Sequence, residues 1–188
     1  MKKLIVAAVA VAMSVVANAA QIKWSNTNGI ADGTADGGTT AAVVYLINSA
    51  TLTQSAIYDA VMAGATLDAV VEGKIVNSTS LADGFMDAQT FTTSAYADNS
   101  KQTMYMVCFD SDLNALYFSE ELNKTILGTG ATKYAFSANS SVEATMADMS
   151  GFDKSYGGWV STAAVPEPTS GLLMLLGMAG LALRRRRA

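Results

Sequence analysis

The sequence contains no histidine and only one cysteine in 188 residues. Without histidine, Ser-His-Asp and Cys-His catalysis are excluded, together with most zinc sites. A single cysteine cannot form an internal disulfide, so the domain is not held together by disulfide bonds. This cysteine, Cys108, lies in the apolar run "MYMVCFD", which predicts a buried, inert thiol.

Arginine and proline are both absent until the last residues of the chain. Residues 20–164 contain six lysines, no arginine and fifteen acidic residues, so their net charge is −9. Binding to nucleic acid requires clustered lysine and arginine, and no nucleic-acid partner is therefore expected. Such an acidic balance suits the solvated surface of an exported protein.

The first residues are typical of a secretory signal peptide. Two lysines open the chain, an apolar run follows from Leu4 to Val16, and Ala17-Asn18-Ala19 provides small residues for the peptidase. We expect residues 1–19 to be removed after Ala19, with cleavage after Ala20 as the alternative. The expected partners at this stage are the export machinery and signal peptidase.

The last residues contain three features in a fixed order. Both prolines lie in Pro166-Glu167-Pro168, residues 171–183 are apolar, and residues 184–187 are all arginine. An apolar helix flanked by arginine orients with the arginines on the cytoplasmic side, which leaves the domain outside. The residues expected to set this orientation are Arg184, Arg185, Arg186 and Arg187.

The predicted transmembrane helix, residues 171–183, is short. At 1.5 Å per residue it spans about 20 Å, which is less than the hydrocarbon core of about 30 Å. A marginal span favours a transient membrane intermediate over a permanent anchor. Residues 161–170 then serve as a linker before the helix, and residues 184–188 as a cytoplasmic tail.

This arrangement resembles the PEP-CTERM sorting signal of bacterial exported proteins. The resemblance implies recognition by exosortase, a membrane protease that cuts near the Pro-Glu-Pro motif, and delivery to the cell surface or extracellular polymer. Pro166, Glu167 and Pro168 would then be recognition residues in a substrate. X-Pro bonds keep such a segment extended, which helps an enzyme to read its backbone.

Residues 20–160 predict one mainly β domain, a β-sandwich with one short helix. The segment 25–40 is rich in glycine, aspartate and threonine, which indicates a loop. The spacing of Ile57, Val61 and Met62 predicts a helix that Thr53 or Ser55 caps and Gly64 ends; residues 68–78 fit helix or strand. Strands are predicted at 41–48, from Phe85, at 132–138, at 155–161, and as a hairpin around "SDLN" at 111–114.

The hairpin region also contains a possible calcium site. Asp110, Asp112, Asn114 and Glu121 occupy positions 1, 3, 5 and 12 of an EF-hand pattern. Position 6 is Ala115, where a calcium loop requires glycine, and the flanking segments predict strands. A polar hairpin turn is therefore the competing interpretation.

These observations predict a noncatalytic exported protein of the cell surface or extracellular matrix, without a cofactor. One alternative is a surface module that binds exopolysaccharide or calcium through its aromatic side chains and acidic loops. The other is a surface glycan hydrolase that uses paired carboxylates. The fifteen acids of the domain make chance pairs of carboxylates inevitable, so the sequence alone does not favour this second alternative.

Overall fold

The chain folds mainly into β-strands. The computed structural model describes residues 20–26, 29–30, 41, 43–82, 84–96, 100–126, 134–138 and 146–163. Within these residues the strands are β1 (Ala20–Asn26), β2 (Val43–Asn48), β3 (Ile75–Ser80), β4 (Gln89–Thr93), β5 (Ser100–Asp110), β6 (Ala115–Phe118), β7 (Leu122–Ile126), β8 (Tyr134–Ala138) and β9 (Gly158–Ser161). The helices are α1 (Gln54–Met62), α2 (Leu67–Val71) and the 3-10 turn η1 (Met149–Gly151).

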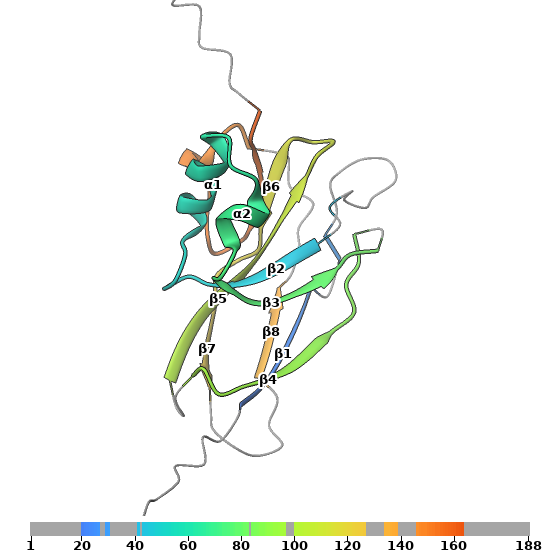
Figure 1. Cartoon of the computed structure of the whole chain (residues 1–188), viewed down its shortest axis with the longest axis vertical. Helices are drawn as coiled ribbons and strands as arrows, with labels where there is room; N and C mark the ends of the chain where they lie inside the picture. Colours follow the sequence, from blue (N-terminus) through green and yellow to red (C-terminus); the bar gives the residue numbers. More distant parts are fainter. Residues whose placement is uncertain are drawn as a thin grey trace, which may run out of the picture.

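The strands form two sheets (Figure 1). The small sheet has the order β4-β1-β8, in which β1 pairs antiparallel with β4 and parallel with β8. The large sheet has the order β3-β2-β5-β6-β9, and β7 pairs with the other end of β5. Two sheets with one helix longer than two turns confirm the predicted mainly β fold.

The hairpin predicted around residues 111–114 is β5 and β6. Its strands pair antiparallel from Val107 opposite Phe118 to Asp110 opposite Ala115. Asn114 ends the turn with a φ of 48°, a left-handed conformation that asparagine tolerates better than most residues. β5 is the longest strand and carries the continuous apolar run because both of its faces are covered.

The first of these faces packs against the small sheet, and we call the buried residues there the inter-sheet layer. Met104, Met106 and Cys108 point into it from β5, while Ile22 and Trp24 come from β1. Its other members include Val44, Leu46, Tyr117, Phe136 and Trp159. The rings of Tyr117 and Trp159 lie 5.4 Å apart, and both tryptophans of the chain are fully buried here.

The opposite face of the large sheet packs against the helices and forms a second core, the helix layer. Its strand residues are Ile47, Tyr105, Val107, Leu116, Phe118 and Val160, and its helix residues are Ile57, Tyr58, Leu67 and Val71. Alternate residues of β5 and β6 therefore enter different layers, as the twofold period of a strand requires. The domain is a sandwich of two sheets with a further layer of helices on the large sheet (Figure 1).

Individual residues define where the helices begin and end. Thr53 caps α1, because its side-chain oxygen accepts a hydrogen bond from the amide of Ala56 at 3.2 Å. Gly64 follows the helix with a φ of 97°, which confirms the predicted stop. Residues 68–78, which fit helix or strand, contain part of each: α2 ends at Val71 and β3 begins at Ile75.

Three sequence-based assignments need correction. Ser25 and Asn26 were assigned to a loop but belong to β1, which has a hydrogen-bonded strand on each side. The strand predicted from Phe85 begins only at Gln89, because Phe85 closes a tight turn back to Ala82. β7 was not anticipated as a separate element.

Candidate functional site

The turn between β5 and β6 contains the first predicted calcium ligands. Asp110 is fully buried, and its Oδ1 accepts hydrogen bonds from the amides of Asp112 at 2.9 Å and Leu113 at 3.0 Å. This is the pattern of an Asx turn, in which the carboxylate replaces backbone partners. The side chain of Asp112 is exposed at the turn.

The other two predicted ligands have partners elsewhere in the fold. The carbonyl oxygen of Asn114 accepts hydrogen bonds from the amide and the hydroxyl of Thr162, both at 2.7 Å. Glu121 forms an ion pair with Lys154 at 3.3 Å. No group of three or more acidic, histidine or cysteine side chains within the described ranges is arranged to hold a metal ion. Calcium binding therefore stays a prediction from the sequence.

Most of the predicted targeting residues lie outside the described part of the chain. These are Ala17, Ala19, Pro166, Glu167, Pro168, Arg184, Arg185, Arg186 and Arg187, together with the apolar segment 171–183. Ala20 is described, and it is the first residue of β1, where it pairs with Thr93. None of the helices among the described residues is long and apolar enough to cross a membrane.

Cys108 lies in the inter-sheet layer and is fully buried. Burial raises the pKa of its thiol far above the ordinary value, and the nearby carboxylate of Asp110 raises it further. Because the thiolate is the reactive form of cysteine, this environment disfavours reaction of the thiol. The predicted burial of Cys108 is confirmed.

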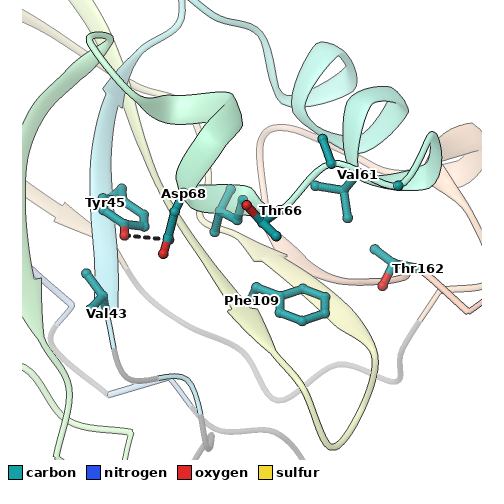
Figure 2. Close-up of a pocket in the computed structure, with 10 residues that line it drawn as sticks. Val43, Tyr45, Val61, Thr66, Asp68, Phe109 and Thr162 are labelled. Atoms are coloured by element: carbon teal, nitrogen blue, oxygen red, sulfur yellow. Dashed lines mark hydrogen bonds between the residues drawn. The ribbon is translucent and has the colours of Figure 1, made fainter.

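A pocket of about 460 Å³ opens at one end of the helix layer (Figure 2). Its walls come from β2, from α1 and α2 with the loop that joins them, from the end of β5, and from Thr162 after β9. The labelled lining residues are Val43, Tyr45, Val61, Thr66, Asp68, Phe109 and Thr162. The volume lies within the range of small-ligand sites, about 300–1,000 Å³.

The pocket exists because two neighbouring strands separate. β2 and β5 are paired from Tyr45 opposite Val107 to Asn48 opposite Met104. Beyond Tyr45 this pairing ends, so Val43 and Phe109 face the gap from separate strands. The loop 63–66 between the two helices borders this gap, and its Gly64, Ala65 and Thr66 line the pocket.

One polar pair lies in the wall of the pocket. The hydroxyl of Tyr45 donates a hydrogen bond of 2.7 Å to Oδ1 of Asp68, drawn as the dashed line in Figure 2. Burial raises the pKa of Tyr45 to about 12, and the hydrogen bond and negative charge of Asp68 contribute to the increase. Tyr45 therefore stays protonated at neutral pH and holds the carboxylate of Asp68 in place.

This pocket was not predicted from the sequence. Its main residues, Tyr45, Asp68 and Phe109, come from three elements far apart in the chain, and no local spacing relates them. The available signal was a phenylalanine at the end of an otherwise buried strand, directly before the polar turn. Phe109 is only partly buried, in contrast to its neighbours Cys108 and Asp110.

Comparison with known proteins identifies the C-terminal segment. A family model described as the PEP-CTERM protein-sorting motif matches residues 164–187. No curated protein and no solved structure matches the chain. The chain thus carries a PEP-CTERM sorting signal, the signal of a protein that is exported, processed by an exosortase-type membrane protease and directed to the cell surface.

Proposed function

We propose that this chain is a noncatalytic protein of the cell surface or extracellular matrix, released from its targeting segments by one cut at each end. The observation that carries the proposal is the position of the fold between the two expected cuts. The described strands, from β1 (Ala20–Asn26) to β9 (Gly158–Ser161), all lie between the expected signal-peptidase bond after Ala19 and the sorting motif at 164–187. With the first cut after Ala19, both cuts would leave every described strand intact, and the alternative cut after Ala20 would remove only the first residue of β1.

The last strand, β9, is held by contacts within the domain that do not involve the sorting segment. β9 pairs with β6 along its length, and Thr162 donates two hydrogen bonds to the carbonyl of Asn114. Trp159, in the middle of β9, is fully buried in the inter-sheet layer. Removal of the tail is therefore expected to leave the stability of the domain nearly unchanged.

A noncatalytic role agrees with the environment of the pocket. Hydrolysis of glycosides by paired carboxylates requires two acidic groups about 5–10 Å apart across the scissile bond. Asp68 is the one carboxylate that lines the described pocket, and its Oδ1 is already bound by Tyr45. These contacts favour a binding or structural surface over a hydrolase.

The proposed route has a membrane intermediate. The N-terminal signal directs the domain outward, and residues 171–183 then span the membrane briefly with residues 184–187 on the cytoplasmic side. Exosortase cuts near Pro166-Glu167-Pro168, and the domain passes to the surface or the surrounding polymer. The linker before the motif is short, so the folded domain stays close to the membrane until the cut.

Intact-mass measurement of the chain from membranes, cell surface and medium tests this route. We expect the surface form to begin at Ala20 or the next residue and to lack the apolar segment and the arginines. A variant with Pro166, Glu167 and Pro168 all changed to alanine should accumulate uncut in the membrane. The control changes Asp59 and Glu72, two exposed residues outside the sorting motif at 164–187, to alanine and should be processed normally. Recovery of the uncut 188-residue chain from the cytoplasm would contradict the proposal.

A further inference from the structure

The pocket between the helices and the large sheet is lined by both apolar and polar side chains. The apolar lining includes Val43, Val61 and the partly buried ring of Phe109. In Figure 2, Val43 lies beside Tyr45, and the ring of Phe109 lies between Val43 and Thr162. The carboxylate of Asp68 and the hydroxyl of Tyr45 form the polar wall. A ligand that matches this lining must present an apolar face to the apolar side chains and hydrogen-bonding groups to the polar pair.

Asp68 is the strongest acceptor in the pocket. Only its Oδ1 is hydrogen-bonded among the described residues, by Tyr45 at 2.7 Å, so Oδ2 can accept from a ligand. Hydrogen bonds to a charged carboxylate are roughly twice as strong as those between neutral groups. Tyr45 holds Asp68 in place before a ligand arrives, which lowers the entropy lost on binding.

The charge of the pocket limits the class of ligand. Asp68 is the single charged residue among its lining residues, and the domain as a whole carries −9. Phosphate groups and uronic acids would be repelled by this carboxylate and would meet no cation. An uncharged ligand with several hydroxyl groups meets an acceptor without this penalty.

We infer that the pocket binds a neutral sugar unit of a polysaccharide, with the C–H face of the sugar on Phe109 and one hydroxyl group donating to Oδ2 of Asp68. Sugars have both properties that the pocket requires, an apolar face and a polar edge. The inference deepens the proposed function, since a surface protein directed to extracellular polymer would contact such chains. The pocket opens beside Thr162, so the processed end of the chain would lie next to the bound polymer.

Isothermal titration calorimetry of the full chain tests the inference. The protein is purified in a zwitterionic detergent, because sugar-based detergents would compete for the pocket. The probes are three neutral hexasaccharides, maltohexaose, cellohexaose and a mannan hexamer, with hexagalacturonate as the anionic comparison. We expect binding of at least one neutral probe at millimolar concentration and none of hexagalacturonate.

Two substitutions with matched controls identify the pocket as the site. Asp68→Asn should weaken binding about tenfold, the value of one hydrogen bond to a charged group, and Phe109→Leu about threefold. Asp59→Asn changes an exposed acid on α1 outside the pocket, and Phe152→Leu changes a partly buried ring on the same layer. Both control variants should bind like the unchanged chain.

Three results would overturn the inference. They are absence of heat with all neutral probes, equal binding of hexagalacturonate, or equal losses in the control variants. Circular dichroism of each variant shows whether a loss of binding reflects unfolding, and Asp68→Asn is expected to stay folded because its side chain is exposed. The substitutions leave the targeting segments unchanged, so failure here is distinct from failure of the export route that intact-mass measurement tests.

Discussion

The two faces of the large sheet are covered in different ways. One face packs against another sheet and forms the inter-sheet layer, in which Trp24, Trp159 and Phe136 are fully buried. The other face packs against α1 and α2, and this helix layer opens into the pocket at Phe109. The same strands thus supply a closed core on one side and a candidate binding surface on the other.

The difference follows from the length of the covering elements. β1, the central strand of the small sheet, has seven residues and is paired on both sides. The helices have nine and five residues and are separated by a short loop. Two such short helices do not cover the whole sheet, and the uncovered end is where β2 leaves β5.

Truncation of a large side chain should have the largest effect in the inter-sheet layer. Trp159→Ala removes a fully buried ring that packs 5.4 Å from Tyr117, and should lower the free energy of unfolding by about 3–5 kcal/mol. Phe109→Ala removes a partly buried ring at an opening that water can fill, so its loss should be about 1–2 kcal/mol. Urea unfolding followed by circular dichroism measures both values.

The difference between the two losses tests whether the helix layer is more loosely packed at Phe109 than the inter-sheet layer is at Trp159. Phe118→Ala is the control, because Phe118 is fully buried in the helix layer and packs on Tyr105 at 6.1 Å. Its loss should approach that of Trp159→Ala. If Phe109→Ala is as destabilising as Phe118→Ala, the open end of the helix layer is as well packed as its centre, contrary to our description.

Sequence patterns predicted the elements that short-range chemistry specifies. β2, α1 with its cap at Thr53, and the β5–β6 hairpin are each defined by neighbouring residues. β1 was missed because its partners are remote, with Ile22 opposite Phe91 on one side and Tyr134 on the other. The pocket was missed for the same reason, since strand separation and helix placement decide it. The sorting motif was recognised because it is read as a linear segment.

An intermediate effect is expected at the cap of α1. Thr53→Ala removes the oxygen that accepts from the amide of Ala56, and should lower the free energy of unfolding by about 1 kcal/mol. The matched control is Ser55→Ala, since the sequence allowed either residue as the cap and the structure gives this role to Thr53. Denaturation midpoints of the two variants distinguish them. Equal losses would mean that both hydroxyl groups, which lie 3.2 Å apart, support the helix.

The last effect concerns Tyr45 in the wall of the pocket, and it does not change stability at neutral pH because it is seen only at alkaline pH. In the folded chain its pKa is raised from 10.0 to about 12, first by burial and then by the hydrogen bond to Asp68. Above pH 10 the unfolded chain loses this proton while the folded chain keeps it, so the stabilisation from Tyr45 is complete below pH 10 and lost by about pH 12. Subtracting the alkaline absorbance titration of Tyr45→Phe from that of the unchanged chain isolates this tyrosine from the others. In Asp68→Asn the titration should move toward lower pH but stay above 10.0, because burial remains. An unshifted titration in Asp68→Asn would show that the carboxylate is not held against Tyr45, and the polar wall of the pocket would then lack its support.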